Sequence, residues 1–95
     1  MNQIERITCM EQILDEAAEA VSFLNEALEK YSSIQDGLQE LAAYYSSEQW
    51  RQDFEDDSAG KIPGGLKRGV LSEDAVYNLL SDDAALKERL RTLRE

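Results

Sequence analysis

Histidine is absent from this chain of 95 residues, and cysteine and proline occur once each. Without histidine there is no imidazole general base, no histidine-assisted nucleophile and no histidine metal ligand. The single cysteine, Cys9, cannot form a disulfide within the chain, and one thiolate cannot hold a zinc ion or an iron–sulfur cluster. Many common enzyme mechanisms are therefore excluded, and we expect a non-enzymatic protein with no catalytic residue, no metal site and no cofactor.

Basic residues are also scarce: ten Lys and Arg stand against twenty Asp and Glu, and the net charge is −10. Attraction to nucleic acid or to anionic lipid needs clustered basic side chains, so we expect neither direct nucleic-acid binding nor membrane attachment. The first ten residues lack the apolar core of a signal peptide, and no apolar run approaches the ~18 residues of a membrane span. These features favour a cytoplasmic protein. Solubility explains the acidity, and mimicry of nucleic acid by an acidic helix is a sharper alternative.

Glycine is concentrated in one place, because four of the five glycines lie between Gly60 and Gly69. The long stretches on either side are free to be helical. When Ile7 is placed at heptad position a, the a and d positions through Tyr45 are apolar except Gln35. The g positions are apolar as well: Ile13, Ala20, Ala27, Ile34 and Leu41. The pattern predicts a long amphipathic N-terminal helix over about 3–45, with a stripe wide enough to pack against two neighbours.

The pair Asp36-Gly37 is the ambiguous point of this helix. Glycine in a helix interior costs about 1 kcal/mol relative to alanine. Asp36 could instead cap a new helix, with Gln39 three residues later. Because Leu38 and Ala42 keep the earlier register, we expect a continuous or gently kinked helix.

The second half of the chain predicts two further helices. Ser47 is a suitable cap for a short helix over about 47–56, in which Trp50 and Phe54 share a face and are expected to plug the end of a bundle. Residues 57–71 form a loop, and Ser72 caps a C-terminal helix over about 72–94. The predicted fold is all-α, a single domain over 1–95 in which the long helix packs with the shorter ones in a small helical bundle.

The middle of the chain holds the candidate binding residues. Trp50, Asp53, Lys67, Arg68 and Tyr77 combine aromatic, acidic and basic side chains, and would suit a small enzyme or a protein that binds an anion. Gly60 and Gly65 have P-loop spacing, but the Lys and Ser or Thr that should follow are missing. The carboxylates of 53–57 could attract a hard cation, but we favour a solvated helix end, or pairing with Lys67 and Arg68, over a metal site.

Charge is distributed unevenly along the chain. Residues 1–45 have nine acidic and two basic side chains, whereas 87–94 have four basic side chains and one acidic. This asymmetry suggests antiparallel or bundled pairing of the first and last helices, within one chain or between chains. The apolar stripe is longer than one short chain can cover. We therefore expect an interaction or adaptor protein whose partner is itself, as a homodimer through the long helix, or another protein.

Several segments together resemble a known bacterial family. They are Arg6-Ile7, then the run from Tyr44 to Trp50, then Asp53 and Asp56, and finally Gly60 to Pro63 and Leu66 to Tyr77. In these segments the chain is similar to the family catalogued as domain of unknown function 4298, over nearly its whole length. The resemblance implies a bacterial, stand-alone, mostly helical protein, and implies no activity and no site residues.

Overall fold

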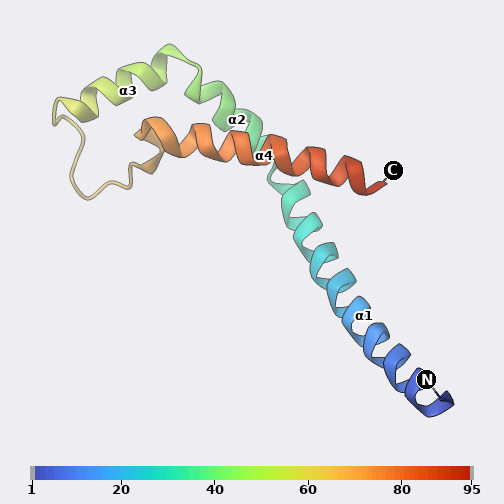
Figure 1. Cartoon of the computed structure of the whole chain (residues 1–95). Coiled ribbons are helices and arrows are strands. Elements are labelled where there is room, and N and C mark those ends of the chain that lie inside the picture. The colour runs from blue at the N-terminus through green and yellow to red at the C-terminus, as the bar shows by residue number, and fades with distance from the viewer. Residues whose placement is uncertain (1, 95) are drawn as a thin grey trace. The chain divides into compact units, whose positions relative to one another are not determined.

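The computed structural model describes residues 2–94, and the predicted all-α fold is confirmed. The elements are α1 (Gln3–Ser33), α2 (Gln35–Tyr45), α3 (Glu48–Ser58), the single 3-10 turn η1 (Gly69–Leu71) and α4 (Glu73–Arg94) (Figure 1). The part of the chain that the structure describes contains no strand. None of its helices is both long enough and apolar enough to cross a membrane.

Local side-chain caps set the starts of three helices. Asn2 caps α1, and its side-chain oxygen accepts a hydrogen bond of 2.8 Å from the Glu5 amide. Ser47 caps α3 by accepting from the Trp50 amide, and Ser72 accepts from the amide of Ala75 in the first turn of α4. Each cap satisfies an N–H that the helix itself leaves without a partner.

The helix expected over residues 3–45, continuous or gently kinked, is instead divided at Ile34 into α1 and α2. In an unbroken helix the Ile34 amide would bond to the Lys30 carbonyl, but it bonds to Tyr31 and Ser32 instead. The Lys30 carbonyl accepts from the Ser33 hydroxyl at 2.7 Å, and the Tyr31 carbonyl accepts from the Gln35 side-chain amide at 2.9 Å. Polar side chains thus take the place of main-chain donors and end α1.

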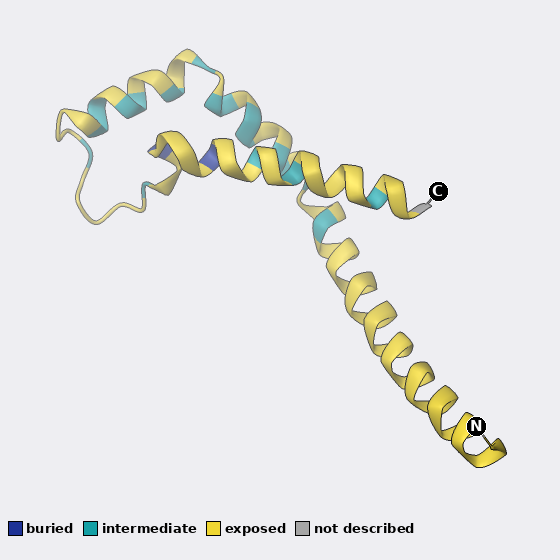
Figure 2. Ribbon diagram, in the orientation of Figure 1, coloured by how far each residue is buried: buried dark blue, intermediate teal, exposed yellow. Residues whose placement is uncertain are grey.

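The described chain divides into two compact units. The first unit ends at Asp36 and consists of α1 with the start of α2. Figure 2 shows that α1 is exposed along nearly its whole length, and no residue in it is buried. The helix therefore has no tertiary support within this unit.

The second unit begins at Gly37 and holds the rest of α2, together with α3, η1 and α4. η1 contacts both α3 and α4. The buried core is small, and its apolar members are Leu71 in η1 and Val76 in α4. The connection between α3 and η1 turns at Gly60, whose φ of 77° is the left-handed conformation that glycine adopts without strain.

Candidate functional site

Two features of the described residues could bind something: the apolar face of α1 and a cavity in the second unit. We define the α1 stripe as the a, d and g residues of α1 from Ile7 onward, with Ile34 at its end. Its large side chains are 37–68% exposed, and its remaining members are alanines and the half-buried Tyr31. The large members are Ile7, Met10, Ile13, Leu14, Val21, Leu24, Leu28 and Ile34.

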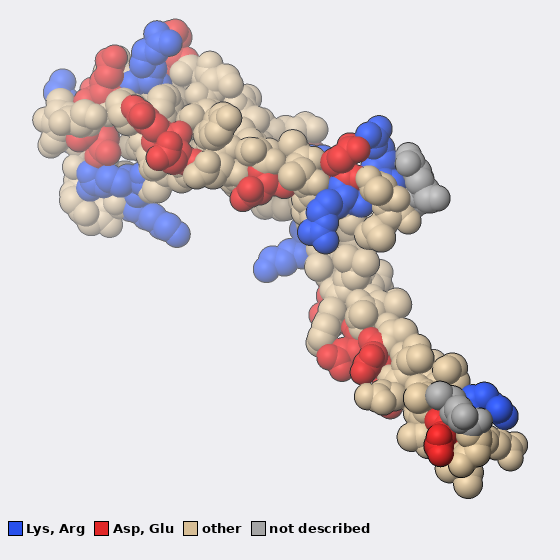
Figure 3. Space-filling view, viewed as in Figure 1, with Lys and Arg blue, Asp and Glu red and all other residues tan. Residues whose placement is uncertain are grey.

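The helix that carries this stripe is acidic. α1 has seven acidic and two basic side chains, and Figure 3 shows acidic groups along it. Phe23 lies next to the g positions Ala20 and Ala27 on the helix surface and is 63% exposed, so it widens the stripe in the middle. The face is thus a continuous apolar surface on a helix of negative charge.

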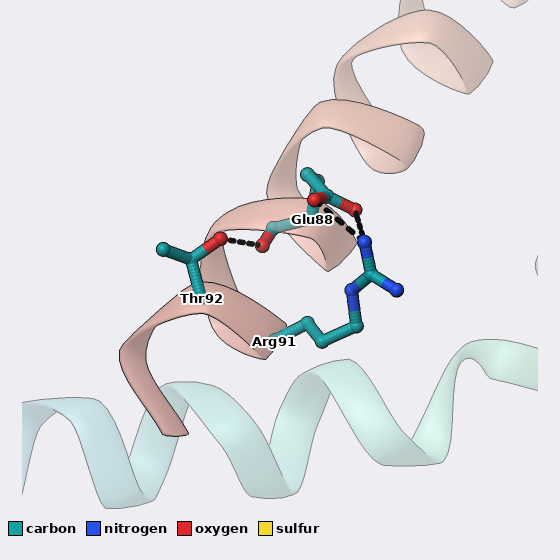
Figure 4. Close-up of polar contacts among 3 residues, drawn as sticks. All are labelled: Glu88, Arg91 and Thr92. Carbon is teal, nitrogen blue, oxygen red and sulfur yellow. Dashed lines mark hydrogen bonds and ion pairs between the residues drawn. The ribbon is translucent and has the colours of Figure 1, made fainter. Parts of the chain in front are cut away.

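The basic end of α4 is partly neutralised within α4. Arg91 donates to both carboxylate oxygens of Glu88, at 2.7 and 2.8 Å, and the Thr92 hydroxyl donates to the Glu88 carbonyl (Figure 4). Lys87 pairs with Asp83 at 2.7 Å. These pairs lower the positive charge that this helix end offers to another molecule.

The cavity of the second unit has a volume of about 270 Å³. It lies among α2, α3, the connection that follows α3, and η1. Its walls are mostly apolar, with polar groups from four of its residues. It is lined by Tyr44, Asp53, Ile62, Leu66, Lys67, Arg68, Val70 and Leu71.

Tyr44 and Asp53 form the polar wall of the cavity. The Tyr44 hydroxyl donates a hydrogen bond of 2.6 Å to an Asp53 carboxylate oxygen, which joins α2 to α3. This bond, together with burial and the charge of the carboxylate, raises the pKa of Tyr44 to about 12. The Asp53 carboxylate is therefore already engaged with the neutral phenol.

Arg68 and Lys67 both line the cavity but differ in their hydrogen bonds and ion pairs. The Arg68 guanidinium pairs with Asp57 and donates a second hydrogen bond, of 2.6 Å, to the Pro63 carbonyl. Arg68 therefore ties the connection to the end of α3. Lys67 is exposed, and its side chain is the cationic group of the cavity not engaged in a described hydrogen bond or ion pair.

The structure brings three of the five predicted binding residues together, namely Asp53, Lys67 and Arg68. Trp50 does not line the cavity. Its indole N–H donates to the Val70 carbonyl at 2.9 Å, and its ring packs between Tyr45 and Phe54, so Trp50 has a structural role. Tyr77 is 63% exposed on α4 and lies outside the cavity.

Within the described residues, no group of acidic or cysteine side chains is placed to hold a metal ion. Asp53 bonds to Tyr44, Asp56 accepts from Gln52 at 2.9 Å, and Asp57 pairs with Arg68. The pairing of the acidic segment with Arg68, anticipated from the sequence, is confirmed.

The residue that sequence reasoning missed is Tyr44. The sequence does not signal its role, because nine residues separate it from Asp53 and no helical spacing relates the two positions. The turn at Ser46-Ser47 between α2 and α3 brings them together, since Ser47 caps α3 and its hydroxyl also donates to the Tyr44 carbonyl at 2.6 Å.

The described helices define an all-α protein with an exposed amphipathic first helix and a small capped helical unit. A family model described as "Domain of unknown function (DUF4298)" matches residues 7–93, and the chain belongs to this family. No curated protein and no solved structure matches the chain.

Proposed function

We propose that this chain is a cytoplasmic protein-interaction module that self-associates through the α1 stripe. The observation that supports it is the exposure of the stripe, on a helix with no buried residue. Helices are marginally stable in water without tertiary packing, so a 31-residue amphipathic helix gains most of its stability from a partner. A second copy is always present and offers an apolar face of the same length.

The area available is sufficient for a stable pair. A standard protein interface buries about 800 Å² on each partner. If each large side chain of the stripe, with Phe23, contributes on the order of 100 Å² of exposed area, one face supplies about 900 Å². The surface therefore reaches the range of specific dimers without help from the second unit.

Light scattering across a range of concentrations tests the proposal. We expect the mass of a dimer for the natural chain at micromolar concentration, and dissociation on dilution. Leu24→Lys places a charge in the middle of the stripe and should weaken association at least 100-fold, because an unpaired charge cannot be buried there cheaply. Glu19→Gln, on the opposite face of α1, is the matched control and should leave the dimer intact.

The sole tryptophan separates loss of association from loss of folding. Trp50 is packed in the second unit, so its fluorescence reports on that unit and not on α1. In Leu24→Lys the Trp50 emission should be unchanged, while the helical ellipticity falls because α1 loses its partner. A monomer at every concentration for the natural chain would refute the proposal.

A second candidate function is the binding of a small anion with an apolar body in the cavity of the second unit. The supporting observation is that an apolar cavity has the exposed Lys67 and the paired Arg68 on its wall. Thermal shifts against a panel of nucleotides and phosphorylated metabolites test it. A ligand that raises the melting temperature of the natural chain, and not that of Lys67→Ala, would support this role; no shift with any ligand would count against it.

A further inference from the structure

We infer that the two copies pair with their α1 helices antiparallel, centred at the level of Glu19. This inference rests on the proposed self-association and adds its geometry. Position a of one helix meets position d of a reversed partner, so only registers seven residues apart keep the seam in contact. Among these, the register centred at Glu19 overlaps almost the whole of α1.

The seam in this register has well-matched layers. Going outward from the centre, each layer joins one a residue and one d residue of the two copies. The layers are Ala17 with Val21, Leu14 with Leu24, Met10 with Leu28, and Ile7 with Tyr31. A parallel pair would instead place Ala17 against Ala17 between two layers of large residues, and would leave space there that costs stability.

The flanking positions decide between the two orientations. In an antiparallel pair the g rows of both copies face each other, which places Ala20 against Ala20 of the partner subunit and Ile13 against the partner's Ala27. The apolar g row is then covered by apolar groups. In a parallel pair each g residue faces an e residue, so that Ala20 and Ala27 would face Asn25 and Ser32 of the partner subunit and bury polar groups against methyl groups.

The e positions and the small residues fit the same arrangement. The e rows would bring Glu11 next to Asn25 of the partner subunit, so no like charges meet. Ala17, Ala18 and Ala20 all lie near the centre, where two reversed helices cross their shared two-fold axis and could approach closely. This interface is self-complementary, as a two-fold dimer requires.

Pairing of α1 with the basic end of α4 of another copy is the competing arrangement. Two observations disfavour it. Arg91 and Lys87 are already bonded to acidic groups of α4 itself. The strongly exposed leucines of α4 are Leu79, Leu86 and Leu93, one every second turn, which makes a row too narrow to cover an a, d and g stripe.

The arrangement has a consequence for the C-terminal ends of the α1 helices. Ile34 of one copy lies opposite residue 4 of the other, so the two Ile34 positions are about 45 Å apart at 1.5 Å per residue. An antiparallel α1 pair therefore places the C-terminal ends of the two α1 helices far apart, whereas a parallel pair would bring these ends together.

Two single-cysteine variants test the orientation in the full-length chain. On a Cys9→Ser background, Ala18→Cys puts a thiol at the proposed two-fold axis, and Met10→Cys puts one in the seam. In the antiparallel pair the Met10 positions are about 27 Å apart. We expect mild oxidation to link the Ala18→Cys variant into a dimer at least tenfold faster than the Met10→Cys variant, and light scattering to give a dimer for both before oxidation.

The natural Cys9 gives an independent distance, since spin labels on it should lie about 30 Å apart along the helix pair. A dimer that links through Met10→Cys, with labels close together, would be parallel and would overturn the inference while the proposed self-association stands. A dimer in which neither variant links would overturn it as well. A monomer would refute the proposed function itself.

Discussion

Tyr44 and Trp50 each make one directional bond that joins two elements of the second unit. The Tyr44 hydroxyl bonds to Asp53, and the Trp50 indole bonds to the Val70 carbonyl. The apolar core of this unit is small, with Leu71 and Val76 as its buried members among the described residues. Such bonds therefore contribute a larger share of stability here than in a domain with an extensive core.

Removal of the Tyr44 hydroxyl should change how stability depends on pH. The folded state raises the pKa of Tyr44 from 10.0 to about 12, so it holds the phenol proton more tightly than the unfolded chain does. This contribution is complete below pH 10 and is lost as the pH rises from 10 toward 12. Urea unfolding across this range should show a steeper loss for the natural chain than for Tyr44→Phe, which at pH 7 should cost about 1 kcal/mol.

The tyrosinate absorbance provides the direct measurement. The chain has four tyrosines, and we expect the pH titration of the absorbance to contain a late component near pH 12 that is missing in Tyr44→Phe. Asp53→Asn should move that component to lower pH, because the amide accepts a hydrogen bond without carrying a negative charge. If all four tyrosines of the natural chain titrate together near pH 10, the bond between Tyr44 and Asp53 is not formed in solution.

Arg68 should control the mobility of the connection between α3 and η1. It holds Asp57 and the Pro63 carbonyl at the same time, which needs the forked guanidinium. Arg68→Lys keeps the charge but should lose one of the two bonds, so trypsin should cleave after Lys61 several-fold faster. Arg51→Lys is the matched control, because its ion pair with Glu48 is fully at the surface, and it should leave the cleavage rate unchanged.

At the scale of elements, the sequence predicted the helices that local chemistry determines. Ser47 and Ser72 were identified as caps, and they cap α3 and α4 in the structure, since a cap needs only neighbours within one turn. The break at Ile34 was not predicted at that residue. The sequence points to Asp36 and Gly37 as helix breakers. In the structure the Ser33 and Gln35 side chains end α1 by bonding to the last carbonyls of the helix.

Gln35 shows why the position of the break was not evident. By heptad position it belongs to the apolar seam, where a polar residue can set helix register or accompany a kink. In the structure its amide bonds to the Tyr31 carbonyl within its own chain. Propensities of single residues do not reveal which of two donors will bond to a carbonyl, because the net free energies of the two hydrogen bonds differ by less than about 1 kcal/mol.

Removal of the two competing side chains should restore the helix across the break. In a Ser33→Ala and Gln35→Ala double variant the Ile34 amide can return to the Lys30 carbonyl. We expect slower hydrogen exchange at the Ile34 and Gln35 amides, measured by NMR, and helical carbon shifts through residue 36. Ser32→Ala, which removes a hydroxyl with no described bond, is the control. Unchanged exchange in the double variant would show that the two side chains do not cause the break.

At the scale of the whole molecule, the sequence indicated an uncovered apolar face but not the orientation of its partner. The a, d and g pattern alone suits either a partner from the same chain or a second copy. The structure adds that α1 has no buried residue within its own unit. The full lining of the cavity could not be predicted from the sequence. Tyr44 and Val70 line it only because the turn after α2 and the 3-10 turn η1 bring them there.

Salt should distinguish which helices associate. Two α1 helices each have a net charge of −5, so their pairing is apolar attraction opposed by charge repulsion. Raising NaCl from about 0.1 M to about 1 M shortens the Debye length from about 10 Å to about 3 Å and screens that repulsion. Sedimentation equilibrium should therefore show a tighter dimer at high salt. Glu19→Gln lowers the charge of each helix and should reduce this salt effect without abolishing the dimer. Pairing of acidic α1 with the basic end of α4 depends on salt in the opposite direction, because salt screens an attraction there. A dimer that weakens as salt rises would therefore identify α4 as the partner of the stripe.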